Sequence, residues 1–246
     1  MRSSTQHFQT TTRRVLSVFV VLLMGSTPLA AQEENQDPWE GFNRKVFAFN
    51  DSVDGAVLKP LAKGYRAITP DPVEQSVGNV FSNLAEVKNV LNSVLQGKPK
   101  EALHDSGRFL VNSTLGILGL FDVAETFGLE QSDGEDFGQT LAVWGVSEGP
   151  YLVLPFFGPS SVRGLAGMPV DSLTDLVNQI DDVPTRNSLM ALELLDLRAS
   201  LLDVEGLASG DKYLFFREAY LQRREFLVND GVVEDDFFDD FEDEDY

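Results

Sequence analysis

The stretch from Phe137 to Gly164 constrains this chain most, because it combines five glycines and three prolines with large aromatic side chains. Glycine permits positive φ and proline lacks a backbone N–H, so no long regular helix or central strand is expected there. Residues 151–157 are nonetheless continuously apolar, unlike a hydrated linker. The stretch is therefore predicted to be a shaped loop or hairpin. It is either a buried turn that supports a core or a surface walled by aromatic side chains that binds an apolar ligand.

Net charge excludes one class of function. The chain has 246 residues and carries 39 acidic against 19 basic side chains, a formal charge of −20. Binding to nucleic acid needs clustered Lys and Arg against phosphate, so we exclude it. The same charge disfavours electrostatic docking on anionic headgroups. Any contact with a membrane is therefore expected to be hydrophobic.

The N-terminus predicts an exported protein. Three arginines precede the apolar run from Val15 to Gly25, and small residues follow it. This pattern is typical of a secretory signal peptide, predicted at 1–31 with cleavage after Ala31. An uncleaved membrane anchor is the alternative. Cleavage would leave 39 acids against 16 bases, a charge of −23.

The remaining chain is predicted to form one domain. A polar leader at 32–36 is followed by a helical domain at 37–231 and by a disordered acidic tail at 232–246. From Asp230 to the C-terminus there are ten acids and no base, a composition that cannot bury enough apolar surface to fold on itself.

Helical patterns fill most of the predicted domain. Asp37 is expected as the N-cap of the first helix, with Pro38 at the first position and Glu40 completing a capping box. An apolar stripe with a spacing of three and four residues follows, and polar residues lie off it. This face either packs on a core or sits in a lipid interface. The stripe consists of Trp39, Phe42, Val46, Phe49, Val53 and Val57, and the residues off it include Asn43 and Asn50.

The segment 59–71 is expected to be irregular, because it contains two prolines and a turn-prone TPDP sequence. Further helices are predicted from Pro72, from Pro99, over 185–202 and over 211–228, the last capped by Asp211. After the signal peptide no apolar run approaches the roughly 18 residues that a spanning helix needs. The domain is therefore predicted to be either soluble or monotopic, lying in an interface.

Catalytic and metal-binding signatures are missing from the sequence. There is no cysteine, and His104 has no second histidine at ligand spacing. The S-x-x-K match at 209–212 lacks companion motifs, and the acidic turn at 133–136 is better explained by solvation than by a cation. We therefore expect no enzyme activity, no cofactor and no metal. The patterns together indicate a protein that moves or binds lipid without chemistry.

Four segments resemble the MlaA/VacJ family of outer-membrane phospholipid-transport proteins. They occur in the family's order, and the resemblance covers about residues 35–231. The segments are DPWEGFNRKVFAFN at 37–50, FLVNSTLGILGLFDVA at 109–124, FGQTLAVWGVSEGPYLVLPFFGPSSVRG at 137–164 and DKYLFFREAYLQRREFLVNDG at 211–231.

This resemblance implies a mainly α fold: a single ring-shaped bundle of amphipathic helices, with a Gly/Pro-rich hairpin that borders a central channel. It also implies a place in the inner leaflet of a Gram-negative outer membrane, beside a trimeric porin. Phospholipids mislocalised in the outer leaflet would pass through the channel to a periplasmic lipid carrier protein, and lipid asymmetry would be maintained.

Carried over by position, the hairpin that borders the channel is expected at 137–165. The channel or hairpin residues are expected to be Gly138, Trp144, Gly145, Gly149, Tyr151 and Arg163, and the gating helix is expected to contribute Phe42, Phe49 and Asn50. A structural ion pair is the alternative role for Arg163.

One departure from the family concerns anchoring. Members are commonly lipoproteins with a lipidated cysteine, and these 246 residues contain no cysteine. Retention is then expected to rest on interfacial helices or on a porin. A soluble periplasmic lipid-binding or scaffold protein is the alternative function.

Overall fold

The computed structural model describes residues 37–207 and 210–232 and is mainly helical, as predicted. The signal peptide and the polar leader lie outside the described residues, as does the acidic tail beyond Val232. The first helix, α3 (Glu40–Val53), runs through one π-helical turn (Asp54–Leu58) directly into α4 (Lys59–Ile68).

The prediction of an irregular segment at 59–71 was therefore wrong. Pro60 lies in the first turn of α4, immediately after the π-helical turn, and α5 begins at Asp71. A proline is tolerated in the first turn of a helix because its missing N–H would lack an intrahelical partner there anyway. The π-helical turn interrupts the regular α-helical hydrogen bonding just before Pro60, and the chain remains helical through it.

Asp37 does not cap α3. The N-cap is Trp39, which makes no side-chain capping bond. Asp37 is buried instead and accepts hydrogen bonds from Asn43 Nδ2, at 2.8 Å, and from the hydroxyl of Tyr213. Arg217 Nη1 lies 3.5 Å from the same carboxylate. Distant donors therefore replace the local capping bond that the sequence predicted.

Helices α5 (Asp71–Leu95) and α6 (Pro99–Thr114) pack side by side along an interface of buried polar residues. We call this set the polar seam; it consists of Asn83, Glu86, Asn89, Asn92, Asp105, Arg108 and Asn112. The apolar run after α6 forms a turn rather than a helix, since Ile117 and Leu118 both have positive φ. A 3₁₀ turn (Ala124–Phe127) follows it.

The Gly/Pro-rich stretch forms a hairpin flanked by two helices, which confirms the prediction of a shaped hairpin. Helix α7 (Phe137–Val143) precedes antiparallel strands β1 (Tyr151–Leu154) and β2 (Gly158–Ser161), and α8 (Val162–Thr174) follows. Tyr151 pairs with Ser161 at the open end and Leu154 with Gly158 at the closed end. The turn is closed by Phe156 and Gly158, both with positive φ.

Two further helices complete the described chain. A 3₁₀ turn (Val177–Gln179) leads to α9 (Val183–Ser200), whose N-cap Asp182 accepts from Thr185 N. A second 3₁₀ turn (Glu205–Leu207) precedes α10 (Lys212–Val228). Asp211 accepts from two backbone N–H groups of the first turn of α10, so the predicted N-cap is confirmed.

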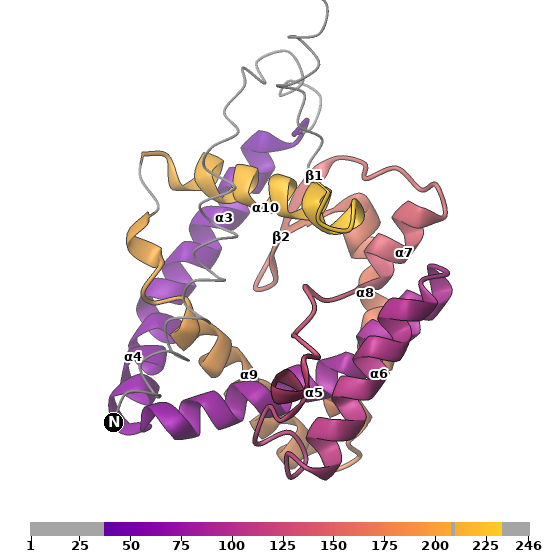
Figure 1. Ribbon diagram of the computed structural model, residues 1–246. Helices are drawn as coiled ribbons and strands as arrows, with labels where there is room; N and C mark the ends of the chain where they lie inside the picture. The colour runs from indigo at the N-terminus through magenta and orange to yellow at the C-terminus, as the bar shows by residue number, and fades with distance from the viewer. Residues whose placement is uncertain (1–36, 208–209, 233–246) are drawn as a thin grey trace, which may run out of the picture.

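These elements close into a ring (Figure 1). Contacts run from α3 to β1, across the hairpin to β2 and α8, then through α7, α5 and α9 to α4, which continues from α3. Helix α10 lies against α7 and β2, and the turn of the hairpin is directed toward the middle of the ring in Figure 1. Within the described ranges no helix is long and apolar enough to cross a membrane.

Candidate functional site

The hairpin is fastened to α3 through its backbone. The buried side chain of Asn43 donates from Nδ2 to the carbonyl of Tyr151, at 3.1 Å, and accepts at Oδ1 from Val153 N, at 2.9 Å. Three residues further along the hairpin, Asn50 donates to Leu154 O and accepts from Phe156 N, both at 2.9 Å. Each carboxamide thus makes the pair of hydrogen bonds, one donated and one accepted, that the backbone of a neighbouring strand would make.

The spacing of the two asparagines matches the strand that they bind. Asn43 and Asn50 are seven residues apart, which is about 10.5 Å along a helix. Their target pairs on β1 are three residues apart, which is roughly 10 Å along a strand. We call these two side chains the asparagine clasp. Because both members must align at once, the clasp fixes the position of the hairpin along α3.

The open end of the hairpin packs on aromatic rings of α10. Tyr151 makes edge contacts with Tyr213 and Tyr220, with ring centroids 6.3 and 5.8 Å apart, and Val153 is fully buried beside them. We call Tyr151, Val153, Tyr213 and Tyr220 the hairpin base. Burial raises the pKa of Tyr151, whose hydroxyl has no hydrogen-bond partner within the described residues. The hairpin is therefore anchored at its base and clasped along its length.

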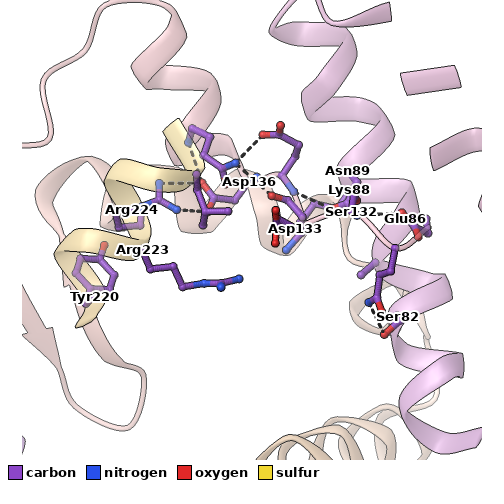
Figure 2. Close-up of a pocket in the computed structure, with 16 residues that line it drawn as sticks. Ser82, Glu86, Lys88, Asn89, Ser132, Asp133, Asp136, Tyr220, Arg223 and Arg224 are labelled. Atoms are coloured by element: carbon purple, nitrogen blue, oxygen red, sulfur yellow. Dashed lines mark hydrogen bonds and ion pairs between the residues drawn. The ribbon is translucent and has the colours of Figure 1, made fainter. Parts of the chain in front are cut away.

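A polar pocket of about 410 Å³ lies between α5, the segment 131–136 and α10 (Figure 2). Most of the charged groups in its walls are paired. Arg224 donates from Nη2 to Asp136 Oδ1 at 3.2 Å, and Glu86 Oε1 accepts from Arg108 Nε at 2.7 Å. Glu135 accepts from Lys98, which lies just outside the pocket lining, at 3.1 Å. Figure 2 shows Arg223 extending from α10 into the open space of this pocket.

The outer faces of several elements expose large apolar side chains. Leu103 on α6 is 75% exposed, and Leu118 in the turn after α6 is 73% exposed. The hairpin turn exposes Phe156 and Phe157 to similar extents. Apolar surface spread over so many elements marks a site of contact with a membrane or with another protein.

Comparison with known proteins assigns this architecture. The family model described as MlaA lipoprotein matches residues 35–227. The chain belongs to the MlaA family. The protein named "Intermembrane phospholipid transport system lipoprotein MlaA" of Escherichia coli (strain K12) is 35% identical over 224 residues, covering 89% of each chain. Its Haemophilus influenzae counterpart is 34% identical over 205 residues, covering 81% of this chain and 82% of that one.

A solved structure supports the same assignment. It was described under "Structural basis for maintenance of bacterial outer membrane lipid asymmetry" and is 36% identical to this MlaA-family chain. The two superpose with a TM-score of 0.70, over 78% of this chain and 99% of that one. The ring-shaped helical fold expected from the resemblance is thereby confirmed.

Three of the predicted glycines have distinct physical roles in this member of the MlaA family. At Gly138 a Cβ would lie 2.9 Å from Arg224 Nη2 and from Asp136 Oδ1, so the glycine lets that ion pair approach α7. Gly149 has φ of +70°, and a Cβ there would lie 3.0 Å from Val162 Cβ. Gly145 has φ of +87° with open space around it. Its requirement is therefore the backbone conformation alone.

The other predicted hairpin residues lie around the same turn. Arg163 is 6% exposed; it donates to Val146 O at 3.0 Å and forms an ion pair with Glu148, so it holds the turn that enters β1. Trp144 is half-exposed, and its Nε1 donates to Leu95 O at the end of α5 at 3.1 Å. Tyr151 lies in the hairpin base. Arg163 thus occupies the structural ion pair that the sequence left as its alternative role.

The apolar stripe of helix α3 is largely exposed. Phe42 and Phe49 are exposed, whereas Asn43 is buried against β1. Phe49 also contacts Phe156 of the hairpin turn, with ring centroids 5.3 Å apart. The sequence left this face open between a core and a lipid interface. In the MlaA-family ring Asn43 of α3 meets β1, and Val46 and Phe47 pack against the buried cluster of Tyr151, Val153 and Tyr213.

Sequence reasoning missed Asn43 and the partners of Asp37. The signal for Asn43 was present, because Asn43 and Asn50 stand seven residues apart and therefore on one helix face. Their bonding to a strand more than 100 positions away was not encoded in that spacing alone.

Proposed function

We propose that this chain is a non-enzymatic phospholipid channel of the Gram-negative outer membrane. It removes phospholipids mislocalised in the outer leaflet and passes them to a periplasmic carrier protein, which maintains lipid asymmetry. Its relatives named as intermembrane phospholipid transport lipoproteins support this proposal, since they match nearly the whole chain.

The observation that carries the proposal is the inverted distribution of polarity. Among the described residues eight apolar residues are buried, against seventeen polar or charged ones, while thirty-four large apolar side chains are exposed. In water this arrangement would expose far more apolar surface than a soluble monomer normally carries. It suits a protein whose outer surface contacts lipid tails and whose interior offers polar groups.

Lipid passage then follows from two kinds of surface. Acyl tails need an apolar wall, and a headgroup needs hydrogen-bond partners when it leaves water. We propose that the exposed hairpin turn and α3 supply the apolar wall, with Phe42, Phe49 and Asn50 forming the gate. Gly138, Trp144, Gly145, Gly149, Tyr151 and Arg163 then shape the hairpin that borders the route.

Retention at the membrane is proposed to use the apolar outer surface together with a trimeric porin. These 246 residues contain no cysteine that could carry acyl chains. Helices that lie in an interface are held by buried apolar area, and a porin partner would cover further apolar surface.

The proposal is tested in a strain deleted for the gene. The expected result is raised outer-leaflet phospholipid and detergent sensitivity, both reversed by the full-length chain. After carbonate extraction the protein should remain with the membranes. Release into the soluble fraction, with unchanged outer-leaflet phospholipid, would instead support a soluble periplasmic lipid-binding protein.

A substitution at Leu118 tests the apolar outer surface. Leu118 is 73% exposed with φ of +57°, a conformation that asparagine tolerates better than leucine. Leu118→Asn should therefore leave thermal stability in detergent unchanged or slightly higher. Membrane partitioning should fall about tenfold if the leucine side chain is buried in lipid. Unchanged partitioning would show that this turn lies outside the membrane.

A further inference from the structure

The pocket between α5, the segment 131–136 and α10 contains two charged side chains of opposite sign without partners. Arg223 on α10 and Asp133 in the segment both line it, and neither makes an ion pair with any described residue. They also lie farther apart than an ion pair allows. Each of the two side chains offers an ion-pair partner to one charge of a zwitterionic ligand.

Most of the other charged groups of the pocket are paired. Glu86 and Asp136 are paired with Arg108 and Arg224, respectively. Lys88 lies near Asp171 and Glu193: burial raises the pKa of these two carboxyls, and the charge of Lys88 opposes that rise. Apart from Lys88, the pocket therefore presents one cation without an ion pair, Arg223, and one carboxylate without an ion pair, Asp133, among the described residues.

Two polar atoms in the pocket walls are buried without a hydrogen-bond partner among the described residues. They are Nε of Arg224, whose side chain is 9% exposed, and Oγ of Ser132. A buried donor left unsatisfied costs about 1–3 kcal/mol. Both atoms are donors, and a phosphate oxygen is an acceptor. An anionic ligand group would satisfy them.

We propose that this pocket binds the zwitterionic headgroup of a phospholipid, with its phosphate at Arg223, Ser132 and Arg224 and its ammonium at Asp133. This assignment rests on the proposed function and names the headgroup class that the channel accepts. The pocket volume of about 410 Å³ lies in the usual range for ligand sites. A headgroup without an ammonium would bind less well, because it would leave the carboxylate of Asp133 without a partner.

The test uses the purified full-length chain and lipids short enough to dissolve as monomers. Dihexanoyl phosphatidylethanolamine and dihexanoyl phosphatidylglycerol share acyl chains and phosphate, and differ in the ammonium. Titration calorimetry with the unmodified protein should give tighter binding of the ethanolamine lipid.

Arg223→Ala should weaken the binding of both lipids by about tenfold, since it removes a charge-assisted hydrogen bond to phosphate. Arg223 is exposed, so the fold should be unaffected. Lys63→Ala is the matched control, because Lys63 is an exposed cation on α4 outside the pocket. This control should bind both lipids like the unmodified protein.

Asp133→Asn separates the two halves of the site. It should weaken phosphatidylethanolamine by about threefold, the value of an exposed charge pair, and leave phosphatidylglycerol unchanged or slightly tighter. Equal loss for both lipids would show that Asp133 does not contact the ammonium and would overturn the zwitterion assignment.

Two further arms identify the source of the phosphate. Glycerophosphoethanolamine, which lacks acyl chains, should compete with the lipid, whereas inorganic phosphate at equal concentration should not. Equal competition by inorganic phosphate would overturn the headgroup assignment in favour of a free-phosphate site. If no variant changes lipid binding while the full chain still restores the deletion strain, the pocket assignment fails and the transport function stands.

Discussion

The polar seam and the hairpin base are both buried, but the seam consists of polar and charged side chains and the base mainly of aromatic and apolar ones. In the seam Arg108 is 2% exposed and donates to Glu86 and Asp122, and Asn112 donates to Asp122. In the hairpin base, aromatic rings and Val153 make the contact. One region is held by hydrogen bonds and ion pairs, and the other by apolar packing.

The difference shows that the buried face of a helix in this protein can be its polar face when its apolar face is exposed. Leu103 and Leu110 of α6 and Val94 of α5 are exposed, so the apolar faces of the seam helices point outward. Their polar faces then have to meet each other. Because a buried polar group usually needs a hydrogen-bond partner, the middle of the seam forms a connected network. Asn89 and Arg108 donate to Glu86, and Arg108 and Asn112 donate to Asp122.

The largest expected effect comes from breaking the seam. Arg108→Met removes the partner of buried Glu86 and leaves that carboxylate uncompensated, so we expect a loss of about 3–5 kcal/mol in the free energy of unfolding. Denaturant titration of the protein in detergent, followed by circular dichroism, measures it.

The matched control is Arg66→Met, which removes an ion pair with the exposed Asp203. Exposed pairs contribute about 1 kcal/mol or less. If both substitutions cost equally little, the seam would be held by its apolar contacts, and the contrast with the hairpin base would disappear.

A smaller loss is expected at the asparagine clasp, which joins polar side chains to the hairpin. Asn43→Ala leaves Tyr151 O and Val153 N without their partners in a buried position, which should cost about 2–4 kcal/mol. Asn50→Ala, at the exposed turn, should cost about 1 kcal/mol.

Amide hydrogen exchange resolves the two halves of the clasp. Exchange at Val153 N–H should speed up in Asn43→Ala, and exchange at Phe156 N–H should speed up in Asn50→Ala. Uniform acceleration across the whole hairpin in either variant would show that the clasp acts as one unit rather than at two separate positions.

Within the hairpin base, the hydroxyl of Tyr151 should be dispensable for stability. Tyr151→Phe removes a buried hydroxyl that has no hydrogen-bond partner among the described residues, so the free energy of unfolding should change by less than about 1 kcal/mol or should rise. Thermal unfolding in detergent measures this. In contrast, Tyr213→Phe removes a donor to buried Asp37 and should lower the stability clearly. Equal losses in both variants would contradict the apolar account of the base.

The smallest expected effect is a pH dependence at a polar contact outside the seam. Burial raises the pKa of Asp196 on α9, and the hydrogen bond from Tyr65 opposes that rise. The folded state therefore holds this proton more tightly than the unfolded state. Stability from this group is greatest below the ordinary aspartate pKa of about 4 and falls as the pH rises through the raised folded value.

Asp196→Asn keeps the acceptor for Tyr65 and should flatten this fall when denaturant titrations are repeated between pH 4 and 7. Asp203→Asn provides a control that should leave the slope between pH 4 and 7 unchanged, because the hydrogen bond from Arg66 lowers the pKa of Asp203 below this range. Stability from Asp203 is present at higher pH and is lost as the pH falls. A slope that is the same in both variants would count against the assignment of Asp196.

Local features of the fold could be predicted from the sequence. Asp211 caps α10, and the glycines and prolines of 137–164 produce a hairpin, because capping and positive φ depend on neighbouring residues. Asp37 was predicted as a cap and instead binds Tyr213, since long-range donors reach it in the folded state. The segment 59–71 was predicted to be irregular, because a π-helical turn that accommodates Pro60 has no simple sequence signature.

The candidate site was predictable to a similar extent. Asn50 was expected in the gating helix and the glycines in the hairpin, whereas Asn43 was missed and the pocket around Arg223 was not foreseen at all. A pocket whose walls come from α5, α10 and the segment 131–136 joins residues more than 90 positions apart. No spacing rule within one element predicts such a meeting.

The sequence by itself determined that helices dominate, that a shaped loop or hairpin lies within 137–164, and that no apolar run after the signal peptide is long enough to span a bilayer. Only the tertiary structure decided which face of each helix is buried. An amphipathic period predicts two faces of different polarity, but the same period serves a helix with its apolar side inward or outward. Closure of the ring settled that choice, because it brought Asn43 to β1 and Glu86 to Arg108 and left Phe42 and Leu103 exposed.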